Sequence, residues 1–301
     1  MFRNHIRRFH NYESITNSLF DKTIPPVKLS YELINKQSII TNTSSSSPIL
    51  ILHGLFGSKL NNRTLGIKLN EQLQRDIYLL DLRNHGDSPH NINHDYQSLS
   101  SDVENFIVEQ NLKDSIIIGH SMGAKTGMAL SLRNPNLISM LINVDNAPVN
   151  LIPNGEFLKY IDILNKIEKL ELTKLKDADN EFIKIESNPL IRSFILQNMK
   201  KNSNGVLKSR IPLNILKKSI ISGEISSWKF PNGHNFFNKP TLFLRGLKSK
   251  YLVDDYIIDI AKFYTNFEIK DLDCGHFVLY EKPKESIELI VDFIKKHEDH
   301  Y

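Results

Sequence analysis

Short, continuous apolar runs recur along the chain and strongly restrict the folds available to it. These runs are Ile49–Leu52, Ile77–Leu82, Ser115–Ile118, Met140–Val144 and Thr241–Leu244. A short apolar run without polar alternation is typical of a strand that is covered on both faces. Amphipathic stretches with helical spacing, such as Leu99–Glu109 and Gly123–Arg133, lie between the runs. Because strands alternate with helices, we predict an α/β fold with a mostly parallel central sheet flanked by helices.

This alternation is interrupted over residues 148–238. Helical candidates occupy the interval, at Glu156–Leu172, Asp179–Glu186 and Leu190–Met199. Their apolar content is too sparse for a separate core, which argues against an independent domain. We therefore predict a helical cap over 148–238, inserted into a core formed by 25–147 and 239–297.

Further elements precede the first apolar run and follow the cap. The segment Pro26–Ile34 alternates apolar and polar residues, which predicts a half-buried strand. After the strand at Thr241–Leu244, we expect a helix near 252–264, a strand at 267–272 and a closing helix near 284–297.

Composition excludes several broad classes of protein. The chain of 301 residues is 40% hydrophobic and 24% charged, which excludes a disordered chain and a coiled-coil rod. No apolar run reaches the roughly 20 residues of a membrane-spanning helix, so we expect no transmembrane segment. The chain has a single cysteine and no Cys/His cluster with zinc spacing, and we therefore predict no metal site.

The excess positive charge is concentrated at the start of the chain. The formal net charge is +4, and Met1–Tyr12 contains Arg3, Arg7 and Arg8 but no acidic residue. The remainder is nearly neutral, so we expect no nucleic-acid partner. An Arg-rich, acid-free, amphipathic start is typical of a mitochondrial transit peptide. We expect residues 1–20 to be a transit segment that directs the protein to the mitochondrial matrix; a basic terminus without a targeting role is the alternative.

The motif Gly119-His120-Ser121-Met122-Gly123 lies between a predicted strand and a predicted helix. A G-x-S-x-G sequence in this context is a nucleophile elbow, in which glycines flank a turn too tight for side chains. The turn lifts the Ser121 hydroxyl out of the sheet, and the helix N-terminus behind it favours negative charge. We predict Ser121 as a catalytic nucleophile, against the alternative of a glycine-bounded turn with a solvated serine.

A second glycine-containing loop, His53-Gly54-Leu55-Phe56-Gly57, directly follows the strand at Ile49–Leu52. In this architecture such a loop supplies one backbone N–H to an oxyanion hole, and the residue after the nucleophile supplies the other. We therefore predict that the N–H groups of Leu55 and Met122 form the hole. We expect His53 to orient the loop rather than to act as a base.

The general base is expected late in the chain, after the last strand. His276 lies there, in Asp273-Cys274-Gly275-His276-Phe277, and Gly275 permits a turn back toward the strand ends. His85 follows another strand and is expected to line or shape the pocket, whereas His120 lies inside the elbow and cannot reach the serine hydroxyl properly. We interpret Cys274 as a buried structural thiol. Trp228 either lines a substrate pocket or packs in the cap.

The acid that orients the histidine has more than one candidate. The commoner position is the loop after Leu244, but that loop has Ser249 where an aspartate is expected, and Asp254 and Asp255 lie further on. Asp145 falls at the carboxyl end of the strand Met140–Val144, where catalytic groups of open α/β sheets gather. We favour Asp145, with Asp254 or Asp255 as alternatives.

Taken together, these motifs resemble one branch of the α/β-hydrolases. The segments that carry the resemblance are His53–Ser58, Asp81–Ser88, Gly119–Gly123 and Val144–Pro148. The branch includes small bacterial esterases, mitochondrial abhydrolase-domain proteins and yeast mitochondrial ethanol acetyltransferases, and the resemblance covers roughly residues 25–295. In that branch the acid follows the strand after the nucleophile helix, which supports Asp145. The resemblance implies acyl transfer from acetyl-CoA to ethanol, with thioesterase and esterase side reactions.

The sequence therefore predicts a serine acyl-transfer enzyme with the triad Ser121, His276 and Asp145. Its expected partners are small molecules, namely an acyl thioester or ester, a short alcohol and water. Acetyl-CoA is expected as a substrate, and no bound cofactor is expected. The alternatives are a plain carboxylesterase or thioesterase with the same triad, and a catalytically silent scaffold.

Overall fold

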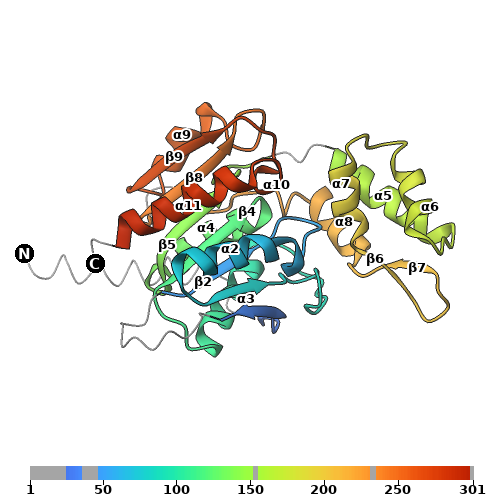
Figure 1. Cartoon of the computed structure of the whole chain (residues 1–301), viewed down its shortest axis with the longest axis horizontal. Helices are drawn as coiled ribbons and strands as arrows, with labels where there is room; N and C mark the ends of the chain where they lie inside the picture. The colour runs from blue at the N-terminus through green and yellow to red at the C-terminus, as the bar shows by residue number, and fades with distance from the viewer. Residues whose placement is uncertain (1–24, 36–46, 152–154, 231–234, 299–301) are drawn as a thin grey trace, which may run out of the picture.

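The chain forms a seven-stranded, mostly parallel sheet with helices on both faces (Figure 1). The computed structural model describes residues 25–35, 47–151, 155–230 and 235–298. The expected transit segment, 1–20, lies outside these residues. The sheet order is β1-β3-β2-β4-β5-β8-β9, and β1 alone is antiparallel to its neighbour. The strands are β1 Tyr31–Ile34, β2 Ile49–Leu52, β3 Ile77–Leu80, β4 Ser115–His120, β5 Ile138–Val144, β8 Thr241–Gly246 and β9 Phe267–Leu272.

Each face of the sheet has its own apolar core because side chains alternate along the strands. On β2, Leu50 and Leu52 join one core and Ile49 and Ile51 join the other. The first core is covered by α3 (Tyr96–Glu109), α4 (Met122–Arg133) and α9 (Ile257–Ala261), and the second by α2 (Arg63–Leu73) and α11 (Pro283–Glu298). The predicted α/β fold with a parallel sheet is thus confirmed.

Two elements differ in extent from the sequence prediction. β1 begins at Tyr31 rather than at Pro26. The backbone N–H of Val27 donates to Asp102 Oδ1 on α3, at 2.8 Å, instead of pairing with a strand. The helix expected near 252–264 is a 3-10 turn at Asp254–Tyr256 followed by α9.

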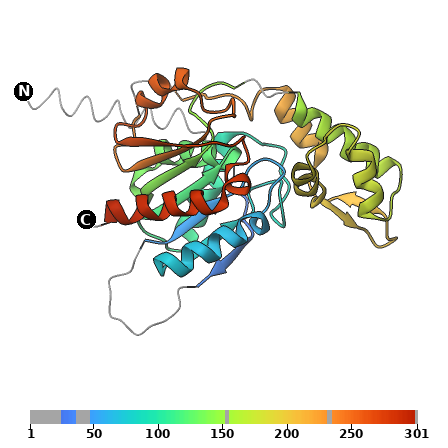
Figure 2. The ribbon, with the colours of Figure 1, turned by 45° about the horizontal axis from the view of Figure 1, so that its top comes forward.

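The interval between β5 and β8 forms a cap beside the sheet (Figures 1 and 2). Its helices are α5 Glu156–Lys169, α6 Leu175–Phe182, α7 Pro189–Leu196 and α8 Leu213–Ile221. A hairpin of β6 (Met199–Lys201) and β7 (Leu207–Ser209), which the sequence analysis did not predict, separates α7 from α8. Buried cap residues such as Ile161 and Leu216 belong to the same hydrophobic cluster as Leu52 of the sheet.

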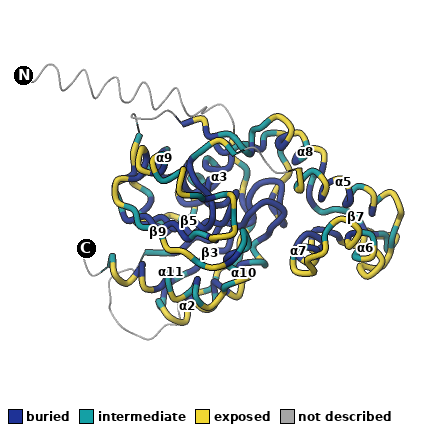
Figure 3. The backbone as a smooth tube through the Cα atoms, turned by 90° about the horizontal axis from the view of Figure 1, so that it is seen from above, coloured by how far each residue is buried: buried dark blue, intermediate teal, exposed yellow. Residues whose placement is uncertain are grey.

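Residues of the central sheet are more deeply buried than residues of the cap helices. The inner strands β2, β3, β4 and β5 are buried, the edge strands β1 and β9 are partly exposed, and the cap helices α6 and α7 present exposed turns to solvent (Figure 3). Within the described ranges, no helix has both the length and the apolar character needed to cross a membrane.

Candidate active site

The sharp turn between β4 and α4 positions Ser121 at the end of a central strand. Ser121 has a φ of 54°, in the left-handed region that side chains rarely adopt. A Cβ at Gly119 would lie 2.3 Å from the Gly123 carbonyl oxygen, and a Cβ at Gly123 would lie 2.3 Å from that of Leu52. Both flanking positions therefore require glycine, as the elbow motif predicts.

Ser121, His276 and Asp145 form a continuous chain of hydrogen bonds. Ser121 Oγ lies 2.8 Å from His276 Nε2, and His276 Nδ1 lies 2.6 Å from Asp145 Oδ2. Because a carboxylate only accepts, the Nδ1 atom carries the proton and Nε2 is the nitrogen that accepts from the serine hydroxyl. The structure thus brings together three side chains that are far apart in the sequence.

The carboxylate of Asp145 is fully buried and has further partners. The Ser249 hydroxyl donates to Asp145 Oδ2 at 2.5 Å, and the Gly246 backbone N–H donates to Oδ1 at 3.1 Å. The alternative acid Asp254 instead pairs with Arg245, and its side chain is 82% exposed. Asp255 is also exposed. Of the candidate acids, Asp145 is the one hydrogen-bonded to His276.

Two neighbouring rings hold the imidazole of His276 in place. Tyr251 stacks on it, with ring centroids 4.0 Å apart. His120 Nε2 donates to the His276 carbonyl oxygen at 2.8 Å. Burial lowers the pKa of His120 to about 3, so its imidazole stays neutral at ordinary pH. His120 therefore contacts the backbone of His276 and makes no hydrogen bond to the serine hydroxyl.

Two buried histidines support the loop that carries Leu55. His53 Nδ1 donates to the Gly54 carbonyl at 2.8 Å, while Nε2 accepts from the Leu82 N–H at 3.0 Å. His85 Nε2 accepts from the Phe56 N–H at 3.1 Å. Burial lowers the pKa of both histidines, which keeps an acceptor nitrogen available on each ring. His85 shapes this loop from beneath and does not line the cavity at Ser121.

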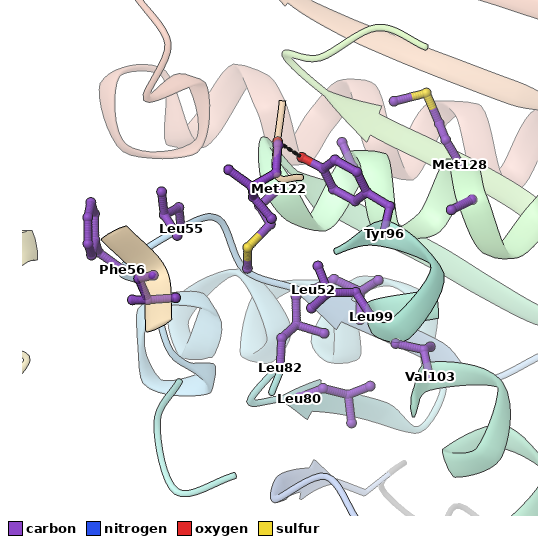
Figure 4. Packing of buried hydrophobic residues seen from close by; sticks show 14 of the residues in the cluster. Leu52, Leu55, Phe56, Leu80, Leu82, Tyr96, Leu99, Val103, Met122 and Met128 are labelled. Atoms are coloured by element: carbon purple, nitrogen blue, oxygen red, sulfur yellow. Dashed lines mark hydrogen bonds between the residues drawn. The ribbon is translucent and has the colours of Figure 1, made fainter. Parts of the chain in front are cut away.

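A small cavity of about 40 Å³ lies beside the serine. Leu55, Met122, Tyr96 and Phe157 contribute to its wall, and Figure 4 shows the first three of these side chains from close by. Leu55 and Met122 lie with Ser121 in the wall of this one cavity, which is where the sequence predicts an oxyanion hole.

The structure also shows the surroundings of Trp228 and Cys274, which the sequence singled out. Trp228 lies outside this cavity and packs against Phe230, with ring centroids 4.5 Å apart. Cys274 is buried, and burial raises the pKa of its thiol to about 11, so it is protonated and unreactive at neutral pH. Among the described residues, no cluster of three or more His, Cys, Asp or Glu side chains could hold a metal ion.

Three further residues of this site have contacts that the sequence pattern did not indicate. Ser249, in the loop where an aspartate is commoner, contacts the acid directly. Tyr251 packs on the imidazole, and Lys125 lines the cavity with its side chain almost fully buried. A lysine one helical turn after the nucleophile was the available signal for Lys125, because lysine is seldom buried.

A strained serine at the end of a central parallel strand, hydrogen-bonded to a histidine and a buried acid, is typical of α/β enzymes that attack carbonyl carbon. A comparison with protein families agrees with this class. The family model described as the alpha/beta hydrolase fold matches residues 47–283. The chain therefore belongs to the α/β-hydrolase family.

Individual relatives cover almost the whole chain. A probable alcohol acetyltransferase of Saccharomyces cerevisiae is 44% identical over 316 residues, which span 99% of this chain and 91% of the relative. The ethanol acetyltransferase 1 of Hanseniaspora uvarum is 30% identical, covering 92% and 90%. The sn-1-specific diacylglycerol lipase ABHD11 of Mus musculus is also 30% identical, covering 89% and 86%. Among solved structures, a marine microorganism esterase matches with a TM-score of 0.79 and 29% identity, covering 89% of this chain and 99% of the esterase.

Proposed function

We propose that this protein is a serine acyl-transfer enzyme, and specifically an alcohol acetyltransferase that makes ethyl acetate from acetyl-CoA and ethanol. Support comes from the geometry at Ser121 and from similarity to proteins named as alcohol and ethanol acetyltransferases. Hydrolysis of the same thioesters and esters is the accompanying side activity.

In the first half of the reaction, Ser121 Oγ attacks the thioester carbonyl while His276 Nε2 takes its proton. Asp145 holds the imidazole with Nδ1 protonated and stabilises the imidazolium. The N–H groups of Leu55 and Met122 stabilise the oxyanion of the tetrahedral intermediate. His276 then gives its proton to the departing thiolate, which leaves an acetyl group on Ser121.

In the second half, His276 accepts the proton of ethanol, and the alkoxide oxygen attacks the acetyl-enzyme. Collapse of the second tetrahedral intermediate releases ethyl acetate and restores the Ser121 hydroxyl. Water can take the place of ethanol and gives acetate instead. The balance between ester and acid depends on how well the cap excludes water from the acetyl-enzyme.

The observation that carries the proposal is the size of the cavity beside Ser121. At about 40 Å³, with Tyr96, Phe157 and Leu151 in its wall, it is comparable in size to an acetyl group. A long-chain lipase needs a larger apolar site for its acyl group. The geometry therefore favours the shortest acyl donors.

The proposal is tested by incubating the purified protein with acetyl-CoA and increasing ethanol. Ethyl acetate is measured by gas chromatography and released CoA by a thiol reagent. We expect ester in proportion to ethanol, loss of both products in Ser121→Ala, and much slower release of CoA from hexanoyl-CoA than from acetyl-CoA. CoA release without ester at any ethanol concentration would refute the transferase and identify a thioesterase.

A plain esterase or thioesterase is the alternative, because the relatives include a lipase and an esterase and the same residues serve hydrolysis. The ratio of ester to acetate separates the two functions. A silent scaffold is distinguished by labelling with a fluorophosphonate, which requires a nucleophilic Ser121. A folded protein that stays unlabelled would favour the scaffold.

We further propose that the protein works in the mitochondrial matrix. The support is the Arg-rich, acid-free segment Met1–Tyr12. A fluorescent protein fused behind residues 1–20 should enter mitochondria, whereas a fusion with Arg3, Arg7 and Arg8 changed to Glu should remain outside. Equal distribution of the two fusions would contradict the assignment.

A further inference from the structure

We propose that a positively charged cavity beside helix α7 binds the phosphorylated nucleotide portion of the CoA thioester. Lys176, Lys200 and Arg210 lie in the wall of this cavity. This inference rests on the proposed use of acetyl-CoA, and it assigns the part of the molecule that remains outside the acetyl cavity.

The chemistry of the site defines the direction in which the leaving group departs. His276 must protonate the thiolate, so the sulfur lies on the His276 side of Ser121 rather than in the acetyl cavity. A second cavity of about 350 Å³ opens on that side and is lined by His276, Phe277 and Phe194. The CoA arm therefore extends through this second cavity.

The second cavity borders a third and larger one at α7. Both cavities have Ser193 and Gln197 in their walls. At that point the core and the cap are joined by a side-chain hydrogen bond from Asn61 Nδ2 to Gln197 Oε1, at 2.8 Å. The third cavity measures about 690 Å³, within the range of sites for ligands of this size.

The walls of the third cavity carry an excess of positive charge. Lys176, Arg192, Lys200 and Arg210 line it, and Asp179 is the acidic residue among its lining side chains. Asp179 is paired with Arg192, whose Nε lies 2.6 Å from Oδ1, and Arg210 is paired with Asp87.

Lys176 and Lys200, by contrast, are exposed and take part in no ion pair within the described ranges. The chain behind its first residues is nearly neutral, so this local excess of positive charge, next to the cavity that His276 lines, stands out from the rest of the described surface. Lysine and arginine bind phosphate groups through charge-assisted hydrogen bonds, so a polyanionic tail fits this cavity.

Binding of CoA itself tests the site without any turnover. Isothermal titration of Ser121→Ala with CoA should give a dissociation constant that rises at least about tenfold when Lys176→Glu and Lys200→Glu are added. Lys113→Glu is the matched control, because Lys113 is exposed at the opposite end of β4 and should leave binding unchanged. Unchanged binding in the double variant would overturn the proposal.

Kinetics separate this inference from the proposed function. With Ser121 intact, the double variant should raise KM for acetyl-CoA and leave its kcat unchanged. Hydrolysis of S-acetylpantetheine and p-nitrophenyl acetate, which lack the nucleotide, should also be unchanged. Adenosine 3′,5′-bisphosphate should compete with acetyl-CoA but not with S-acetylpantetheine.

Failure of the proposed CoA site and failure of the proposed transferase activity give different results. If the two lysine substitutions weaken CoA binding but no ester forms, the CoA site is supported and the transferase activity is refuted. Ester formation that is equal for acetyl-CoA and S-acetylpantetheine, and insensitive to the two lysines, would retain the transferase and refute the site.

Discussion

At the scale of single residues, the site depends on how the acid is held. Asp145 lies at the tip of β5 with a φ of 52°, is fully buried, and accepts hydrogen bonds from the Gly246 N–H, the Ser249 hydroxyl and His276 Nδ1. A buried carboxylate requires such partners because desolvation of its charge is costly. The surrounding donors therefore define both the position of the acid and the tautomer of His276.

Replacing the acid separates the two assignments that the sequence left open. In Asp145→Asn, the amide can donate to His276 Nδ1 and favour the wrong tautomer, so kcat should fall by about 10³ to 10⁴. Asp254→Asn removes only an exposed partner of Arg245 and should change kcat less than about twofold. Steady-state hydrolysis of p-nitrophenyl acetate measures both. A larger loss in Asp254→Asn than in Asp145→Asn would reverse the assignment.

Ser249 offers a milder perturbation of the same carboxylate. Ser249→Ala removes the donor 2.5 Å from Asp145 Oδ2 and leaves the other two in place. The loss of one hydrogen bond to a charged group costs about 1.5 kcal/mol, so kcat should drop about tenfold. Ser249→Thr keeps the hydroxyl and should recover most of the rate. Equal rates in the wild type and the alanine variant would show that this contact does not position the triad.

At the scale of elements, the elbow between β4 and α4 lies unusually close to β2. Gly123 packs its Cα against the backbone of Leu52, and the N-terminal turn of α4 consequently lies next to the loop of Leu55. This proximity places Leu55 and Met122 in the wall of the same cavity as Ser121. The close approach of Gly123 to Leu52 therefore positions the residues around Ser121 and also packs α4 against the sheet.

Adding one methyl group at this contact should disrupt the elbow. Gly123→Ala forces its Cβ against the Leu52 carbonyl at 2.3 Å, and we expect a stability loss of about 2 kcal/mol or more together with loss of activity. Gly155→Ala is the control, because its Cβ would meet nothing within 4 Å and its φ is −56°. Urea unfolding monitored by circular dichroism gives both values. Equal stability of the two variants would contradict the close approach.

Lys125 joins α4 to both ends of the cap. Its Nζ donates to the carbonyl oxygens of Val149, at 2.7 Å, and Ser226, at 3.2 Å, while the Tyr96 ring centroid lies 5.5 Å away. Val149 and Ser226 belong to the segments that enter and leave the cap. The Lys125 side chain thus links helix α4 to the two segments that connect the cap to the core.

Burial lowers the pKa of Lys125 to about 7, which predicts a pH-dependent stability. The unfolded chain, with a lysine pKa near 10.4, binds more protons than the folded protein between pH 7 and 10. By linkage, the free energy of unfolding should therefore rise with pH, by on the order of 2 kcal/mol from pH 7 to pH 9. Lys125→Met should lack this increment, whereas Lys113→Met should keep it. Identical pH slopes in urea unfolding of Lys125→Met and the wild type would exclude the effect.

At the scale of the whole molecule, the cap divides the surroundings of Ser121 into separate spaces. The cavity beside Ser121 is lined by core and cap residues together, including Met122 and Phe157. The cavities on the His276 side follow α7 toward the cap hairpin. Polar contacts such as Asn198 Nδ2 to the Phe56 carbonyl, at 2.7 Å, connect the cap to the oxyanion loop. Cap residues therefore take part both in the wall around Ser121 and in the contacts of the loop that carries Leu55.

The sequence by itself determined the class of fold, because apolar runs and amphipathic helices are local patterns with distinct periods. It also located Ser121 and the loop of Leu55, because tight turns demand glycine at definite positions. It also predicted His276 as the base and favoured Asp145 as the acid, with Asp254 or Asp255 as alternatives.

Tertiary structure decided what depends on contacts between distant segments. The choice of Asp145 as the partner of His276, its contact with Ser249, and the burial of Lys125 arise from loops that meet only after the sheet has formed. Cavity sizes likewise depend on where the cap packs, and no local pattern encodes them. The physical reason is that propensity and periodicity act over a few residues, whereas a site is assembled across more than a hundred.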